Sequence, residues 1–143
     1  MPFNEASVKS AEAPLSGKKY FTLEEANQSL SYVRRVVEDI QGVYGKIVEI
    51  RHRLEELGES QFSLSPDSEY ERLMDRLGEL VDEVHFMGAE LKDFEKGLVD
   101  FPAVHEDREI LLCWKHGEGV IGYWHELDAG YGGRQSVDLL AAG

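Results

Sequence analysis

The stretch that decides the fold runs over residues 22–58 and reads TLEEANQSLSYVRRVVEDIQGVYGKIVEIRHRLEELG. Its apolar residues recur at alternating steps of three and four, which is the spacing of a coiled-coil seam on one face of a helix. Thr22 and Glu25 form a capping-box pattern at the start, and Gly58 is a stop signal. The pattern therefore predicts a helix over residues 22–57. The seam positions are Val33, Val36, Ile40, Val43, Ile47, Ile50, Leu54 and Leu57.

A second helix is predicted over residues 66–93. Ser65, Pro66 and Asp67 form a start signal, with Ser as the N-cap and Pro at the first helical position. Because the connection between the two helices is short, they should be antiparallel neighbours. We therefore expect a long antiparallel α-helical hairpin of the coiled-coil type. The second seam consists of Tyr70, Leu73, Leu77, Leu80, Val84, Met87 and Leu91.

Each predicted helix carries a second apolar row beside its seam. A two-helix seam needs only a narrow stripe, so a wider apolar face implies a further partner. We predict a homodimer through the helices, which would make the protein a non-enzymatic interaction or assembly module. The alternative is that the C-terminal part of the same chain covers this row. The row consists of Leu23, Leu30, Val37, Tyr44, Met74 and Val81.

The C-terminal third is predicted to form a small three-stranded antiparallel β-meander over residues 98–125, which makes the chain an α+β protein. The runs 98–105, 108–115 and 120–125 are separated by short turn-type connections. Asp100 should lie on the opposite face, on an edge strand. The other residues of that face should be Pro102, Leu111, Cys113, Lys115, Val120, Gly122 and Trp124. Matching the helical seams places this sheet near residues 20–32. The apolar face should collect Val99, Phe101, Ala103, Ile110, Leu112, Trp114, Ile121, Tyr123 and His125.

The remaining segments are predicted to lie outside these elements. Residues 1–19 show no periodicity and should form a flexible N-terminal arm. Residues 126–135 form a glycine-rich loop, and residues 136–143 form a C-terminal tail. Residues 20–135 are then a single domain.

Composition excludes several classes of function. The 143-residue chain carries a net charge of −13, which repels phosphate backbones and anionic membranes, so neither nucleic acid nor a membrane is expected as a partner. No apolar run approaches the roughly 20 residues that span a bilayer. Cys113 is the single cysteine; it has no predicted base beside it and is expected to be inert. An internal disulfide is therefore excluded, and we expect a cytoplasmic location.

Polar residues of varied chemistry gather after the last predicted strand. His125 can titrate or ligate a metal, and Glu126 and Asp128 follow it on a loop. With Asp100 they supply donors for a divalent metal ion. Arg134 is a candidate for binding a carboxylate or phosphate anion. A metal- or small-anion-binding protein, including a hydrolase-like enzyme, is therefore the alternative to the assembly module, and whether the protein is an enzyme stays open.

Several short segments together resemble a known family. They read YFTLEEAN at 20–27, ELKD and GLVDFPA within 90–103, LCWK at 112–115, IGYWHE at 121–126 and GRQ at 133–135. This combination resembles the bacterial domain-of-unknown-function family 2203, over residues 20–135. The resemblance implies a bacterial cytosolic protein. It supplies no activity and no catalytic residue.

The homodimer is tested by light scattering on the purified chain after size exclusion. We expect twice the 16.2 kDa mass of the chain, because the second apolar row would be covered by a partner. A dilution series serves as the control. A clean monomer at micromolar concentration would count heavily against the assembly module.

Overall fold

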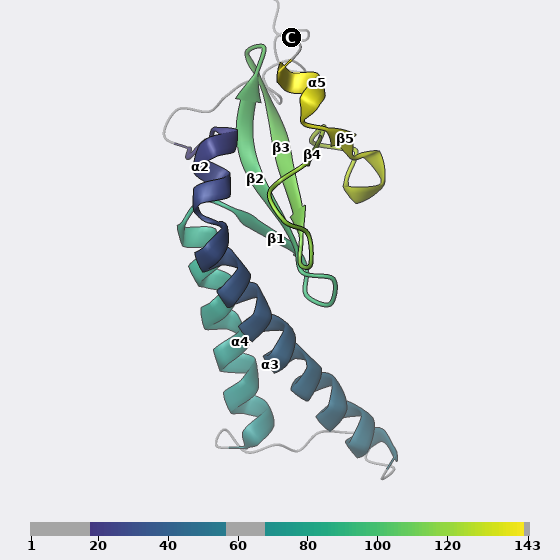
Figure 1. Ribbon diagram of the computed structural model, residues 1–143. Coiled ribbons are helices and arrows are strands. Elements are labelled where there is room, and N and C mark those ends of the chain that lie inside the picture. The colour runs from purple at the N-terminus through teal and green to yellow at the C-terminus, as the bar shows by residue number, and fades with distance from the viewer. Residues whose placement is uncertain (1–17, 57–67, 142–143) are drawn as a thin grey trace, which may run out of the picture.

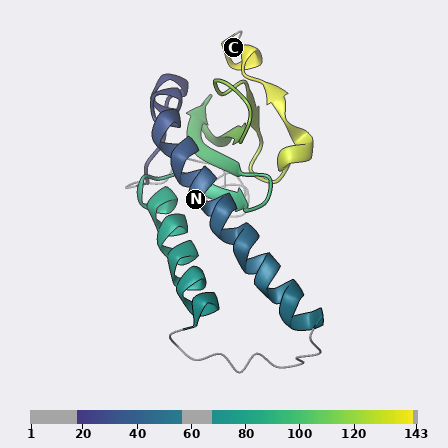
Figure 2. The ribbon, with the colours of Figure 1, turned by 60° about the horizontal axis from the view of Figure 1, so that its bottom comes forward.

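In the computed structural model, which describes residues 18–56 and 68–141, a helical hairpin packs against a five-stranded antiparallel sheet (Figure 1). The protein is therefore of the α+β class. Figure 2 shows the sheet beside the start of the first long helix, while the other end of the hairpin extends beyond it. The elements are α2 (Leu23–Gln28), α3 (Leu30–Glu56), α4 (Glu69–Phe86), β1 (Glu90–Asp93), β2 (Leu98–His105), β3 (Arg108–Lys115), β4 (Tyr123–His125), the 3-10 helix η1 (Tyr131–Gly133), β5 (Gln135–Ser136) and α5 (Asp138–Ala141).

The seam of the hairpin buries the residues that its spacing selected. In both views α3 and α4 lie side by side and run in opposite directions. Burial is deepest near the sheet and lower toward Glu56, where Ile50 and Leu54 are half-buried. Leu57, Gly58 and the predicted start at Ser65 lie outside the described residues. The fully buried seam residues are Val33, Val36, Ile40, Ile47, Leu77, Leu80 and Val84.

The first predicted helix is interrupted once. The capping box is confirmed, because Thr22 Oγ1 accepts from Glu25 N at 3.0 Å and Glu25 Oε1 accepts from Thr22 N at 2.9 Å. The continuous helix over 22–57 is wrong at Ser29, which separates α2 from α3. The Ser29 hydroxyl donates to Ala26 O at 2.7 Å. Such a bond offers the backbone an alternative to the regular helical ladder.

The second predicted helix ends early. α4 begins after Ser68, whose side chain accepts from Glu71 N, and ends at Phe86. Gly88 then takes φ +102°, a left-handed conformation that stops a helix. Residues 90–93 form β1 and pair with β2, so the helix predicted to residue 93 is wrong there. By pairing with β2, these residues gain hydrogen-bond partners for backbone carbonyls that would have had none in the last turn of a helix.

The sheet is a meander of five strands in chain order rather than the three that the sequence predicted. The extra strands are β1 and β5, and β5 joins the last residue of the predicted glycine-rich loop to the first residue of the predicted tail. With β1 on its flank, β2 is not an edge strand. β1 pairs only as far as Asp100, so Pro102 lies past its end, where a missing N–H costs no ladder bond.

The last long strand of the predicted meander is shorter and shifted. A turn over 116–119 would place Tyr123 opposite Leu112, but the structure pairs Tyr123 with Cys113 and His125 with Leu111. A shift of one residue moves every side chain of a strand to the other face. Trp124 therefore packs in the core, while His125 lies on the face of Asp100. The prediction that put His125 on the apolar face opposite Asp100 is wrong.

The sheet covers part of the second apolar row within one chain. Leu30 and Val37 are buried, and Tyr44 stacks on Phe94 with ring centroids 5.3 Å apart. The predicted placement of the sheet is confirmed at Asn27, whose Oδ1 accepts from Ile121 N at 2.7 Å. The homodimer stays a prediction, but Leu30, Val37 and Tyr44 no longer support it, because they are covered within one chain.

The turn between β1 and β2 approaches α3 closely at Gly97. This glycine takes φ +69°, and a Cβ there would lie 2.9 Å from Val37 Cγ1 and 2.8 Å from His116 Cβ. We expect Gly97→Ala to lower the free energy of unfolding by about 2–4 kcal/mol, from backbone strain and overpacking together. Urea unfolding measures this loss.

Gly117→Ala is the matched control, because Gly117 also has a positive φ but open space around its Cβ position. It should lose only the strain, about 1–2 kcal/mol. Equal losses in the two variants would show that the contact with α3 is not tight.

Candidate functional site

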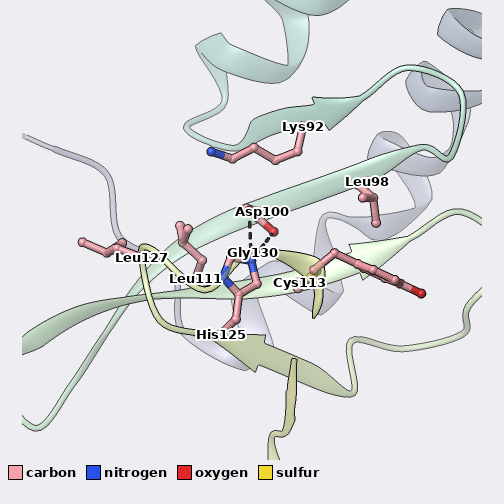
Figure 3. Close-up of a pocket in the computed structure, with 9 residues that line it drawn as sticks. Lys92, Leu98, Asp100, Leu111, Cys113, His125, Leu127 and Gly130 are labelled. Atoms are coloured by element: carbon pink, nitrogen blue, oxygen red, sulfur yellow. Dashed lines mark hydrogen bonds and ion pairs between the residues drawn. The ribbon is translucent and has the colours of Figure 1, made fainter. Parts of the chain in front are cut away.

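Three chemically reactive side chains meet on the face of the sheet that points away from the helices. Asp100 and Cys113 are direct cross-strand partners on β2 and β3, and His125 follows from β4. All three are buried, and their potential ligand atoms all lie within 4.8 Å of one another. Figure 3 shows Asp100 and His125 pointing toward each other across β3. We call these three residues the trio.

The hydrogen bonds of His125 fix its proton pattern. Nδ1 lies 2.7 Å from the backbone carbonyl of Glu126, and a carbonyl can only accept, so Nδ1 carries a proton. Nε2 lies 3.1 and 3.2 Å from the two Asp100 oxygens. If Nε2 carried no proton, its lone pair would face the carboxylate oxygens and repel them. The contact between Nε2 and Asp100 therefore needs one further proton or a cation between the two groups. Nε2 is thus aimed at the centre of the trio.

Burial shifts the pKa values of Asp100 and Cys113, the two other members of the trio. Desolvation raises the pKa of Asp100, although His125 beside it acts in the opposite direction. Desolvation and the Asp100 charge together raise the pKa of the Cys113 thiol to about 12. Without a metal, Cys113 is therefore protonated at neutral pH and is a poor nucleophile. This agrees with its predicted inertness toward substrates.

The trio opens into a cavity of about 130 Å³. The cavity has a polar floor, formed by the trio, and largely apolar walls. Figure 3 shows Lys92 on the neighbouring strand β1, on the same side of the sheet as Asp100. A concave apolar pocket with a few convergent polar groups is the usual form of a small-ligand site. The remaining lining residues are Lys92, Leu98, Leu111, Leu127, Gly130 and Tyr131.

The structure brings together two of the four predicted metal ligands. His125 and Asp100 are in contact, whereas Asp128 is exposed. The Glu126 carboxylate pairs with Arg108, and only its backbone carbonyl supports the site. Sequence reasoning missed Cys113 as a ligand, although the predicted meander already placed it on the same face as Asp100.

Arg134, the predicted anion-binding residue, is paired with the carboxylate of Glu118 in the same chain. Both terminal nitrogens donate to Glu118 at 2.7 Å, and the guanidinium packs against the rings of Tyr123 and Tyr131, 4.1 and 4.7 Å from their centroids. The ion pair lowers the pKa of Glu118, against its desolvation, and raises that of Arg134. Arg134 thus links the glycine-rich segment to the connection between β3 and β4.

One other charged residue is buried in the described part of the chain, and its partners are clear. Glu109 accepts from Lys18 Nζ at 2.6 Å and from the Tyr20 hydroxyl at 2.9 Å. It contacts Lys18 and Tyr20 and does not line the cavity. Among buried charged groups, Asp100 and His125 are therefore the pair that needs a functional explanation.

The fold and the trio define an α+β protein in which a helical hairpin backs a meander with a candidate metal centre. Residues 19–137 match the family described as "Uncharacterized conserved protein (DUF2203)", and the chain belongs to this family. The resemblance seen in the sequence is thereby confirmed. No curated protein and no solved structure gave a match. None of the helices within 18–56 and 68–141 has the length and apolarity to cross a bilayer.

The ion pair between Glu118 and Arg134 should make the free energy of unfolding decrease at acidic pH. Because the folded-state pKa of Glu118 is lowered, its contribution is complete above the ordinary value of about 4.3 and is lost as pH falls through the lowered value. We expect Glu118→Gln to cost about 1–2 kcal/mol at neutral pH. Its urea midpoint should also fall less than that of the unchanged chain between about pH 5 and about pH 3.

Glu49→Gln is the control, since Glu49 is exposed on α3 and makes no ion pair within the described residues. It should leave both the midpoint and its acid dependence unchanged. Parallel acid curves for Glu118→Gln and the unchanged chain would contradict the inferred role of the pair.

Proposed function

We propose that the protein binds a divalent transition metal of the zinc type through Asp100, Cys113 and His125. The observation that carries this proposal is the convergence of a carboxylate, a thiol and an imidazole nitrogen within 4.8 Å, at the floor of a cavity. Carboxylate, thiolate and imidazole are the three ligand types that zinc uses in proteins. A sulfur donor among them disfavours magnesium and calcium, which take oxygen ligands.

The distances suit a tetrahedral ion. Zinc–nitrogen and zinc–oxygen bonds of about 2.0–2.1 Å at tetrahedral angles separate the two ligand atoms by about 3.3 Å. His125 Nε2 lies 3.1 and 3.2 Å from the Asp100 oxygens. An ion between them would replace the proton that this contact otherwise needs, so little movement of either side chain would be required.

The support around His125 is also of the kind found at metal centres. A metal-ligating histidine commonly donates its other ring N–H to a carbonyl or carboxylate, which fixes the ring and its tautomer. In this chain Nδ1 donates to the carbonyl of Glu126. The residue that the sequence suggested as a ligand is thus proposed to act through its backbone, as a positioning group.

Three protein ligands beside a cavity resemble catalytic rather than structural zinc sites, which keep one position open. A metal held there would supply a Lewis acid and a bound water of lowered pKa. Cys113 cannot act as a nucleophile activated by His125, because Asp100 takes Nε2 and Glu126 takes Nδ1. The function proposed is metal binding, and a reaction at the open position would be its extension.

We also retain two further proposals from the sequence. A thiol ligand that must stay reduced fits a cytoplasmic location. Assembly through the helices is favoured by the exposure of large apolar side chains on both, above all Phe86, which is 91% exposed. The others on the helical hairpin are Tyr32, Val48 and Met74. Homodimerisation is therefore the second candidate function.

The metal proposal is tested on the full chain with cobalt(II) as a spectroscopic probe and with elemental analysis. We expect one metal ion per chain and a thiolate-to-cobalt charge-transfer band. Cys113→Ser should remove this band while weaker binding persists, because the hydroxyl is a poorer ligand. Asp100→Asn should lower the cobalt affinity by more than about 100-fold, exceeding the loss caused by removing a supporting group.

His52→Gln is the control, since His52 is an exposed histidine on α3. It should bind cobalt like the unchanged chain. Purified protein without metal, no charge-transfer band on cobalt addition and no rise of Tm with zinc would together overturn the proposal and leave the trio as a hydrogen-bonded network.

A further inference from the structure

Lys92 enters the cavity from a distorted strand. β1 pairs Leu91 with Val99 and Asp93 with Leu98, so Lys92 is the extra residue of a β-bulge. Bulges re-aim side chains and are frequent beside functional sites. Lys92 lines the same cavity as the trio, and its charge acts on Asp100. The bulge thus places one cation in the lining of the cavity that the trio opens into.

We infer that this cavity binds a small monocarboxylate, with its carboxylate shared between the metal and Lys92; this inference rests on the proposed function. Zinc with one carboxylate and one thiolate ligand is neutral, and Lys92 with its partner Glu90 adds no net charge, so a carboxylate would be held by the open metal position and by the ammonium N–H groups. An ammonium group has three N–H donors, and Glu90 accepts one of them at 2.9 Å. The others can serve a carboxylate in the cavity.

The walls set the size and polarity of the rest of the ligand. Leu98, Leu111 and Leu127 line the cavity, which measures about 130 Å³. An apolar protein cavity of about 150 Å³ holds benzene, which has six heavy atoms, as butyrate does. A short aliphatic acid of about four carbons fits this space and buries its chain against the leucines. Apolar burial of this kind contributes about 0.8 kcal/mol for each CH₂ group.

Phosphate fits the cavity less well. A phosphate dianion needs several donors, and Lys92 is the one cationic side chain in the described lining. Arg134, the residue suited to a bidentate anion, is bonded to Glu118. The apolar walls would also leave phosphate oxygens without partners. The single ammonium group and the apolar walls together favour a monocarboxylate.

The test titrates cobalt-loaded full-length protein with butyrate and follows the visible cobalt spectrum. We expect a saturable spectral change with butyrate, a weaker one with acetate and none with inorganic phosphate at equal concentration. Metal-free protein should bind no butyrate by calorimetry, because Asp100 then faces the carboxylate. Lys92→Met, saturated with cobalt beforehand, should weaken butyrate binding about tenfold, as expected for a lost charge-assisted bond.

Two further variants keep the outcome clear. Lys46→Met, at an exposed lysine of α3, is the matched control and should bind butyrate like the unchanged chain. Leu127→Ala should reduce the preference for butyrate over acetate. Cobalt binding without a butyrate response, tighter binding of phosphate, or unchanged butyrate affinity in Lys92→Met would overturn this inference and leave the proposed function standing. Absence of cobalt binding would overturn the proposed function itself.

Discussion

The architecture depends on covering one face of β2 and β3 with the helical hairpin. Val99, Phe101, Leu112 and Trp114 alternate on this face and are fully buried. Because side chains alternate along a strand, burying these four fixes the register of the pair. Asp100 and Cys113 are thereby forced onto the opposite face, directly across from each other. Their meeting is thus a by-product of the apolar packing.

The hairpin was readable from the sequence, because steps of three and four leave little choice of structure. Its end was not, since Met87 and Leu91 continue the helical spacing by coincidence. Gly88 carried the contrary signal, but a glycine inside an apolar pattern does not reveal its φ. β1 also depends on pairing with β2, which is a tertiary contact that no local pattern reports. A strand of this kind can be predicted only after the strand that it pairs with has been located.

The candidate site was likewise predictable only in part from the sequence. Asp100 and Cys113 could be paired from the alternation in two well-marked strands. His125 was chosen as a candidate ligand but placed on the wrong face, because the connection after Lys115 is longer than its glycines suggested. Glu126 and Asp128 were grouped with it by closeness in sequence, yet one pairs with Arg108 and the other is exposed. Predicting that His125 meets Asp100 required the pairing register of β4 with β3. That register depends on the length of the loop between the two strands.

The strictly sequential order of the strands has a consequence for how the chain reaches its native state. Every strand pairs with the one before it, so each step closes only a short loop, and the entropy lost on closure grows slowly with loop length. Topologies dominated by such near-neighbour pairings fold quickly. The three residues of the candidate centre all lie within 100–125, a single contiguous segment. The centre can therefore take shape with the middle of the meander, before β5 pairs with β4.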